Sequence, residues 1–366
     1  MYGEGLCPPP HIGEVMKHYR LVVVLLLCMI AMGIHAVTRT VDINGAGQYT
    51  SIQTALNASS YGDSVLVYPG RYLENVRISN SNISLISMEA LTSDAAYITD
   101  TIIDGSLISS GLWVSENTQN TKMRGFTVTN CRVGIFLDRY SSSEISNCVI
   151  MGNKAASGSG MNVYKCTTVL SGVQIYNNYS YIMAGGIYIN GYLGSVNVTF
   201  DPVNRCSIYN NTAGAGQDIV AHSINNDLSI PLDMFTVANP NSYYAAPYRA
   251  SGNEFQLLID VQRAHHQEVN SDLFVSPTGD DANDGLSPAT AMKTISTAVY
   301  RVASDSLNQR TVHILPGTYS RTANQQVFPI PLKNWVKVQG AGIDATQIVG
   351  EMDPAFANVQ YNALKV

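Results

Sequence analysis

The densest run of oxygen-bearing side chains in the sequence is Asp-Asp-Ala-Asn-Asp-Gly at residues 280–285. Carboxylate and amide oxygens are the ligands that Ca²⁺ prefers in proteins. The candidate metal ligands in this run are Asp280, Asp281, Asn283 and Asp284. Ala282 interrupts the alternation of ligands that a calcium loop requires. Because aspartate and asparagine also build turns, the run predicts either a calcium site or a turn ahead of a helix.

Other residues with chemical potential are few and scattered. Asp138-Arg139 is the best local pair of acid and base, and a lone pair of this kind predicts a solvated salt bridge. His265-His266 are adjacent, so in an extended segment their rings face opposite ways and suit one metal poorly. The sequence contains no His-Glu-x-x-His, no Gly-x-Ser-x-Gly and no phosphate loop. No catalytic residue can therefore be assigned.

Tyrosine is frequent, and six of the 21 tyrosines crowd into residues 176–209. If their rings point outward along a flat sheet, they can stack against the apolar C–H faces of sugars. If they point inward, they belong to the core. The sequence leaves both interpretations open.

Composition limits the class of protein. Only 13% of residues are charged and the chain has 29 glycines, which is typical of a β-rich, turn-rich protein. The net charge of −6 and the absence of a Lys/Arg cluster beyond the N-terminus exclude nucleic acid as a partner.

The N-terminus predicts export. Lys17 and Arg20 precede an apolar run at residues 21–32, and Ala36 is a small residue suited to cleavage. The run is too short to span a bilayer comfortably, so no transmembrane span is expected in the mature chain. Residues 1–36 are interpreted as an upstream extension plus signal peptide. Four cysteines remain beyond it, either as stacked buried thiols or with at least one disulfide: Cys131, Cys148, Cys166 and Cys206.

The chain contains an internal duplication. The apolar strand, Pro-Gly turn and tyrosine at residues 65–72 return at residues 312–319. Three flanking segments return in the same order: 51–56 and 294–299, 83–86 and 336–339, 101–105 and 346–350. In each copy the segment before the strand has helical spacing of apolar residues. We expect it to be a short helix that caps the end of a solenoid.

Between the copies, short alternating strands end in asparagine. The aligned residues Asn130, Asn153, Asn178 and Asn211 are separated by 23, 25 and 33 residues. A period in the low twenties predicts the coils of a parallel β-helix, with these asparagines stacked in one column at a bend. A β-sandwich is the rival architecture because it also uses short strands.

These patterns divide the chain into segments. Residues 37–230 form the first parallel β-helix unit, and residues 231–271, which are rich in proline and tyrosine, form a connecting segment. Within it, residues 257–261 are interpreted as a strand or the end of a coil. Residues 272–366 are the start of a second, truncated unit, because the sequence stops within the repeating pattern.

The sequence also resembles a known superfamily. Residues 274–285, with Ser287-Pro288 and residues 316–319, resemble the N-terminal portion of secreted pectate-lyase-like proteins of unassigned function. The Asn-Asn and Gly-Gly-Ile rungs resemble repeats of bacterial polymorphic outer-membrane and adhesin proteins. The resemblance implies an all-β fold: two tandem units of right-handed parallel β-helix with short N-terminal cap helices.

Residues 70–76, from Gly70 to Val76, are similar to the early motif of pectin methylesterases. The paired aspartates and the flanking glutamines of that family are missing. Gln217-Asp218 resembles one piece superficially but follows a glycine-rich turn, so we interpret it as turn chemistry. No cluster of aspartates typical of polysaccharide hydrolases recurs. The early motif is therefore interpreted as a structural turn.

The sequence thus predicts an exported bacterial protein located outside the cell or on its outer surface. The leading function is a non-catalytic, adhesin-like module that binds extracellular polysaccharide or a cell surface. The alternative is a polysaccharide-active enzyme, pectate lyase-like or pectin esterase-like, with an unrecognised site. A third possibility is a spacer that displays other domains.

Overall fold

The computed structural model describes residues 36–192, 194–249, 254–326, 328, 330–350 and 364–365. The predicted export signal lies, except for its last residue, outside the described residues. None of the described helices combines the length and apolarity needed to span a bilayer.

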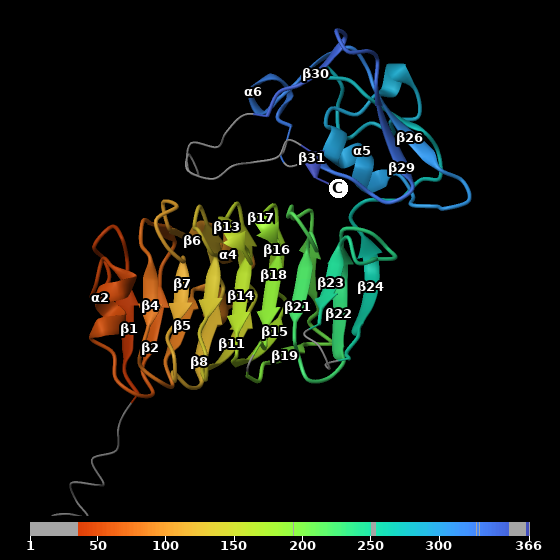
Figure 1. Ribbon diagram of the computed structural model, residues 1–366. Coiled ribbons are helices and arrows are strands. Elements are labelled where there is room, and N and C mark those ends of the chain that lie inside the picture. The colour runs from red at the N-terminus through yellow and green to blue at the C-terminus, as the bar shows by residue number, and fades with distance from the viewer. Residues whose placement is uncertain are drawn as a thin grey trace, which may run out of the picture. The chain divides into compact units, whose positions relative to one another are not determined.

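The first unit is a right-handed parallel β-helix built from three long sheets, in which every strand pair is parallel. Figure 1 shows its strands side by side, with colours that follow the chain order from β1 to β24. Sheet 1 contains β1 (Thr38–Val41), β2 (Ser64–Val67), β5 (Ser84–Ser87), β8 (Thr121–Arg124), β11 (Ser142–Ser146), β15 (Thr167–Ser171) and β19 (Asn197–Phe200).

Sheets 2 and 3 complete each coil. Sheet 2 contains β3 (Gly70–Tyr72), β6 (Thr101–Asp104), β9 (Thr127–Thr129), β12 (Val149–Met151), β16 (Gln174–Tyr176), β20 (Cys206–Tyr209), β22 (Leu228–Phe235) and β24 (Leu257–Ala264). Sheet 3 contains β4 (Val76–Ile78), β7 (Leu112–Val114), β10 (Ile135–Leu137), β14 (Met161–Tyr164), β18 (Ile187–Asn190), β21 (Ile219–His222) and β23 (Ala245–Tyr248). Between sheets 2 and 3, β13 (Lys154–Ser157) pairs with β17 (Tyr179–Met183).

Strand alternation places apolar residues from all three sheets of each coil inside the unit. On sheet 1 the inward residues pair directly from one coil to the next and are at most 4% exposed. This column consists of Val65, Leu85, Met123, Ile145, Leu170 and Phe200. A single coil could not bury these side chains, so the core exists only because the coils stack. The predicted parallel β-helix is confirmed, and the β-sandwich alternative is wrong.

Short helices cap each unit as expected. In α2 (Ile52–Asn57), Ser51 is the N-cap and accepts a hydrogen bond from the amide of Thr54 at 3.2 Å. In α5 (Ile295–Arg301), Thr294 is the N-cap. Both helices bury their apolar face. The other helices are α3 (Glu89–Thr92), α4 (Ala96–Asp100), η1 (Pro288–Thr290) and α6 (Arg321–Asn324).

A ladder of buried amides connects the coils at the bend between sheets 2 and 3. The Nδ2 of Asn153 donates to the Oδ1 of Asn178 at 2.9 Å, and the Nδ2 of Asn178 donates to Asn211 at 3.0 Å. Each Oδ1 in the ladder also accepts the backbone N–H of the coil before it. Three of the four predicted asparagines therefore form the expected column.

The prediction was wrong for Asn130. Its place in the column is taken by Cys131, whose backbone N–H donates to Asn153. Asn130 has φ of 54°, and it aligns with the residues that turn the chain one position before the ladder. Asparagine tolerates this left-handed conformation, so the same residue type serves two adjacent positions of the bend and the sequence does not distinguish them.

The first unit is longer than predicted. Residues 231–264, assigned to the connecting segment, contain most of β22 and all of β23 and β24, which extend sheets 2 and 3 by further parallel pairings. The expected boundary at residue 230 therefore differs from the structure. The two prolines predicted a linker, but Pro231 lies inside β22 and Pro247 inside β23, near the end of each sheet.

The second unit repeats the arrangement on a smaller scale. One sheet contains β25 (Leu273–Val275), β26 (Arg310–Ile314) and β29 (Val336–Gly340), and β27 (Gly317–Tyr319) pairs with β30 (Thr346–Ile348). The remaining pair is β28 (Ile330–Pro331) with β31 (Leu364–Lys365). All pairings are parallel, in agreement with two tandem units.

The four cysteines beyond the N-terminus are free and buried. Burial raises the pKa of Cys131, Cys166 and Cys206 to about 12 and that of Cys148 to about 11. They are therefore unreactive thiols that fill the core, and the disulfide alternative is wrong.

Candidate functional site

The acidic run of the second unit builds the loop that precedes α5. Both carboxylate oxygens of Asp281 are hydrogen-bonded: the backbone amides of Lys293 and Thr294 and the hydroxyl of Thr294 donate to them at 2.8–3.0 Å. Asp281 therefore fixes the residues that start the helix. This is the turn chemistry that was the alternative to a metal site.

The other three candidate ligands also bond within the loop. Asp280 and Asp284 each accept the backbone amide two residues further on at 3.0 Å, and Asn283 donates to the carbonyl of Ala291 at 2.9 Å. Among the described residues, no group of three or more His, Cys, Asp or Glu side chains is placed to hold a metal ion. Calcium binding by this loop stays a prediction.

The side chains of Asp138 and Arg139, the candidate acid–base pair, do not bond to each other. The Nε of Arg139 binds Glu116 at 3.0 Å, and this hydrogen bond raises the pKa of the guanidinium. Asp138 instead accepts the backbone amide of Arg139. Arg139 therefore forms a surface ion pair with Glu116, and the salt bridge predicted between Asp138 and Arg139 is not present among the described residues.

The two histidines that follow β24 lie with their rings 4.6 Å apart at an angle of 72°. Burial lowers the pKa of His266 to about 3, so its imidazole is neutral. The ring of His265 packs 4.6 Å from Tyr209. These contacts give the pair a packing role.

The motif shared with pectin methylesterases is structural in this chain. The hydroxyl of Tyr72 donates to the carbonyl of Tyr68 at 2.9 Å, and burial raises its pKa to about 12. Glu74 accepts hydrogen bonds from the backbone of Ile52 and Gln53, so it caps α2. In the second unit, Tyr319 and Gln326 make the equivalent contacts.

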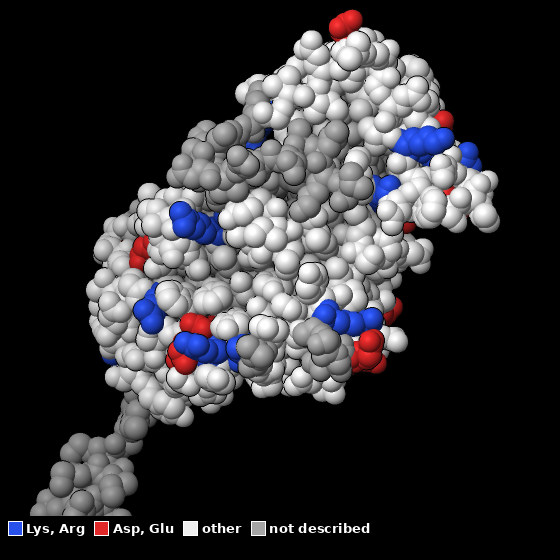
Figure 2. All heavy atoms as spheres, in the orientation of Figure 1, with Lys and Arg blue, Asp and Glu red and all other residues white. Residues whose placement is uncertain are grey.

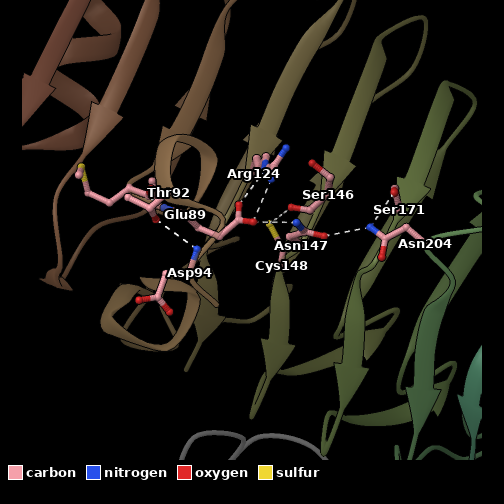
Figure 3. A network of polar contacts seen from close by, with 11 residues as sticks. Glu89, Thr92, Asp94, Arg124, Ser146, Asn147, Cys148, Ser171 and Asn204 are labelled. Carbon is pink, nitrogen blue, oxygen red and sulfur yellow. Dashed lines mark hydrogen bonds and ion pairs between the residues drawn. The ribbon is translucent and has the colours of Figure 1, made fainter. Parts of the chain in front are cut away.

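The most extensive polar network shown lies where sheet 1 bends into sheet 2 (Figure 3). Arg124 forms two hydrogen bonds with Glu89, at 2.7 and 3.0 Å, and Asn147 donates to the same carboxylate at 2.8 Å. Asn204 then joins Asn147 to Ser171. Burial acts to raise the pKa of Glu89, but the hydrogen bonds from Arg124 and Asn147 outweigh it and hold that pKa below its ordinary value. The network connects successive coils, and both oxygens of the Glu89 carboxylate accept hydrogen bonds within it.

The outer face of sheet 3 carries aromatic residues on six of its seven strands. Trp113 on β7 pairs with Phe136 on β10, which pairs with Asn162 on β14 and then Tyr188 on β18. Each stands between buried neighbours on its strand, so each points away from the core. A second outward row consists of Tyr164, Asn190, His222 and Tyr248. We call these eight residues, with Arg77 on β4, the aromatic face.

The rings of this face meet at steep angles at both ends. Trp113 and Phe136 are 5.9 Å apart at 63°. His222 accepts or donates a hydrogen bond with the hydroxyl of Tyr188 at 2.9 Å and lies edge to face with Tyr248, 5.2 Å away at 81°. Tyr248 is 55% exposed.

His222 is also stacked with Tyr188, at 6.4 Å and 22°, and with Tyr192, at 5.3 Å and 16°. The Cζ of Arg77 lies 4.4 Å from the centre of the Trp113 ring. Only part of the ring surface of this face is therefore open to solvent. Burial also lowers the pKa of His222, so this end of the face is uncharged at neutral pH.

Two polar atoms of the face have no hydrogen-bond partner among the described residues. They are the indole Nε1 of Trp113 and the amide Oδ1 of Asn162, and both are buried from water. One is a donor and the other an acceptor. An unpaired buried polar atom costs free energy, which a bound ligand with hydroxyl groups could recover after a small side-chain movement.

Charge is sparse over this face. Figure 2, drawn in the orientation of Figure 1, shows few Lys, Arg, Asp or Glu side chains over the middle of the first unit, and those visible gather toward its margins. The aromatic face carries the positive charge of Arg77, and Lys165 lies 4.9 Å over its Tyr164 ring; the other polar groups of the face are amides, hydroxyls, an imidazole and an indole N–H.

The tyrosines of sheet 2 are arranged differently. Tyr176 and Tyr209 are stacked 5.0 Å apart at only 9°, so their ring faces cover one another. Each of these two rings therefore has one face covered by the other ring. Tyr179 is buried. The tyrosine cluster of the sequence thus divides between a stacked ladder, the core and the aromatic face.

The sequence analysis did not find this face. Of its tyrosines only Tyr188 belongs to the cluster at residues 176–209. The other aromatic residues of the face were not predicted, because the coils differ in length and the pairing of strands cannot be counted from the sequence. Strand alternation within each coil was the available signal.

Comparisons with known proteins add little about activity. Residues 277–353 match a family described as "Protein of unknown function (DUF1565)". A pectin methylesterase from Aspergillus niger is 14% identical with a TM-score of 0.35, covering 90% of this chain and 89% of that one. A pectin methylesterase from carrot is 12% identical with a TM-score of 0.33, covering 87% and 89%. No curated protein sequence matches the chain. These likenesses concern the fold alone.

Proposed function

We propose that the protein is a non-catalytic glycan-binding module and that the aromatic face is its binding surface. The observation that carries this proposal is the run of outward-pointing aromatic side chains on consecutive strands of sheet 3. Such ring faces pack against the C–H faces of sugars. The unpaired atoms of Trp113 and Asn162 would then meet sugar hydroxyls.

The proposal includes a location outside the cell or on its outer surface, where an extended polysaccharide or a neighbouring cell surface would be the partner. The basic and apolar segments at residues 17–32 support it, since they are typical of an export signal. The enzymatic alternative has less support. A lyase or hydrolase needs free acid and base groups, and Glu116 and Glu254 beside the face are paired with Arg139 and Arg249.

Calorimetric titration of the full chain with a panel of soluble polysaccharides tests the proposal. We expect binding that Trp113→Ala and Tyr248→Ala each weaken about tenfold or more, because aromatic anchors dominate such interfaces. Tyr61→Ala is the matched control, since Tyr61 is similarly exposed at 59% but lies on the loop before β2. Equal affinities for all three variants would contradict the proposal.

The same preparation, incubated with uronic-acid polymers with and without calcium, tests the enzymatic alternative. A glycan-binding module leaves the polymer intact. New ultraviolet absorbance from unsaturated products would overturn the non-catalytic assignment.

A further inference from the structure

Arg77 differs from the other arginines of the first unit. Seven of the nine arginines between residues 38 and 266 form ion pairs with carboxylates. They are Arg39, Arg71, Arg124, Arg139, Arg205, Arg249 and Arg263. Arg77 and Arg132 have no carboxylate partner among the described residues. Of these two, only Arg77 has a side-chain hydrogen bond or a ring contact with other described residues, and it lies on the aromatic face.

Three contacts fix the Arg77 side chain and its strand. Its Nε donates to the hydroxyl of Ser115 at 2.7 Å, and its Cζ lies 4.4 Å from the centre of the Trp113 ring. The side-chain amide of Gln53 bonds to both the backbone N–H and the carbonyl of Arg77, at 2.7 and 3.1 Å. The guanidinium is therefore oriented by neutral groups, which leaves its positive charge uncompensated.

The free edge of this guanidinium is available to a ligand. The side chain is exposed, and neither of its two Nη atoms has a hydrogen-bond partner among the described residues. The Nη pair forms a planar fork that fits two oxygens of one acidic group. Because Ser115 and Trp113 already hold the fork, little side-chain freedom remains to be lost on binding.

Arg77 also lines a polar cavity. It has a volume of about 290 Å³, and its lining includes Asn57, Ser79 and Asn80 together with Arg77. The hydroxyl of Ser79 is 3.1 Å from that of Ser115, so the cavity adjoins the group that orients the guanidinium. A charged group bound at the fork would therefore have hydroxyl and amide neighbours for the rest of its sugar.

We propose that Arg77 is an anion-binding residue that receives an acidic substituent, a carboxylate or a sulfate ester, on a glycan that lies along the aromatic face. This inference rests on the proposed function and names the chemical class of its ligand. The Trp113 ring supports the Arg77 guanidinium, and the neighbouring rings of the aromatic face support the sugar. Arg77 lies on β4, so the acidic group is recognised at the β4 end of the face.

Fluorescence titration separates this proposal from the proposed function. The chain has two tryptophans, Trp113 and Trp335, so in a Trp335→Phe background only Trp113 reports. The probes are three oligosaccharides of equal length that are neutral, carboxylated or sulfated. We expect the acidic probes to bind more tightly than the neutral one. Arg77→Gln should weaken the acidic probes by about tenfold or more and leave the neutral one unchanged, since a charge-assisted bidentate contact is lost.

Two further variants complete the experiment. Arg77→Lys keeps the charge but not the fork, and should restore only part of the lost affinity. Arg132→Gln is the matched control, because Arg132 is exposed and unpaired but lies at the bend after β9; it should change nothing. Preference for the acidic probes should also fall as salt is raised.

The outcomes are distinguishable. If the neutral and acidic probes bind equally and Arg77→Gln changes neither, Arg77 is not an anion-binding residue, while the glycan-binding function stands. If Arg77→Gln weakens all three probes alike, Arg77 only supports Trp113 and the proposal is wrong. If no probe binds, the proposed function itself fails.

Discussion

The residue that best shows how this solenoid handles polar groups is Asp218. It ends the buried ladder: its Oδ1 accepts the Nδ2 of Asn211 at 2.9 Å, and its Oδ2 accepts the hydroxyl of Thr236 at 2.6 Å. A carboxylate can only accept, so it suits the end of a row in which every coil donates. Its burial has a cost. Although these hydrogen bonds favour the ionised form, burial raises the pKa of Asp218 to about 7.

This pKa predicts that stability falls as the pH rises. The unfolded carboxyl titrates near pH 4, so between about pH 4 and 7 the folded state binds the extra proton. The stabilisation is fully present below the pKa that Asp218 has in the unfolded chain, and it is lost as the pH rises through the pKa that Asp218 has in the folded protein. Asp218→Asn should not show this loss. Between pH 4 and 8 the free energy of unfolding of the variant should therefore rise relative to that of the wild type by up to about 4 kcal/mol. Urea unfolding across this pH range measures it.

Asp100→Asn is the control, because Asp100 is exposed at the end of α4. It should follow the wild-type profile. A constant difference between Asp218→Asn and the wild type at every pH would mean that Asp218 does not titrate in the folded protein in this range.

Residue types alone predicted part of this ladder. The strand-ending asparagines indicated a stacked column, and Gln217-Asp218 was correctly interpreted as turn chemistry, since Gln217 bonds to the amide of Ala213 at 2.6 Å. The sequence could not show that Asp218 joins the same column. It lies seven residues after Asn211, and that offset becomes an adjacent position only when the loop folds back.

At the scale of elements, the bend between sheets 1 and 2 depends on left-handed residues. Gly125, Asn147 and Gly172 follow successive strands of sheet 1 and have φ of 86°, 48° and 63°. Gly125 also leaves room for the Glu89 carboxylate, since an added Cβ would lie 3.0 Å from the Cβ of Glu89 and would collide with the hydroxyl of Ser87. Glycine therefore serves both the turn and the packing.

Gly125→Ala separates these two roles when it is compared with Gly45→Ala. Gly45 has φ of 90° but no atom within 4 Å of an added Cβ. Gly45→Ala should lower the free energy of unfolding only by the cost of a strained backbone, about 1–2 kcal/mol. Gly125→Ala should lower the free energy of unfolding by about 2 kcal/mol more, because its Cβ also displaces the network around Glu89. Denaturant unfolding of both variants measures the difference. If both lose the same amount, the packing around Gly125 adapts without cost.

The elements themselves were predicted where a local signal marks them. The cap helices have an N-cap residue followed by apolar residues at helical spacing, and both formed. The strands at residues 231–248 were missed because Pro231 and Pro247 indicated a linker, whereas residues 257–261 were interpreted as a strand or the end of a coil. Pro247 lies on β23, the edge strand of sheet 3, where proline is tolerated.

At the scale of the whole molecule, the candidate site belongs to no single coil. The aromatic face draws one or two side chains from each strand of sheet 3, and these side chains become neighbours only through the parallel pairing of coils. Coil lengths vary, so the sequence does not place Trp113 and Phe136 side by side. Fold prediction needed only a repeating pattern, but site prediction needed the register.

This arrangement predicts that affinity depends on ligand length. Neighbouring strands are about 4.8 Å apart, so the five intervals from Trp113 on β7 to Tyr248 on β23 span about 24 Å. A linear glycan that runs across the strands should gain affinity with each added sugar until it covers this span, and then gain no more. Calorimetric titration with a homologous series of oligosaccharides measures the relation.

Variants at the two ends give the sharper test. Trp113→Ala and Tyr248→Ala should each weaken a long oligosaccharide strongly, and each should shorten the length at which affinity stops rising, because one anchor is lost. A short oligosaccharide can occupy either end, so each single variant should weaken it less than the long one, and only the double variant should abolish its binding. Tyr61→Ala should reproduce the wild-type length dependence. An affinity independent of length would place the ligand in one local pocket, and the extended face would then have no part in recognition.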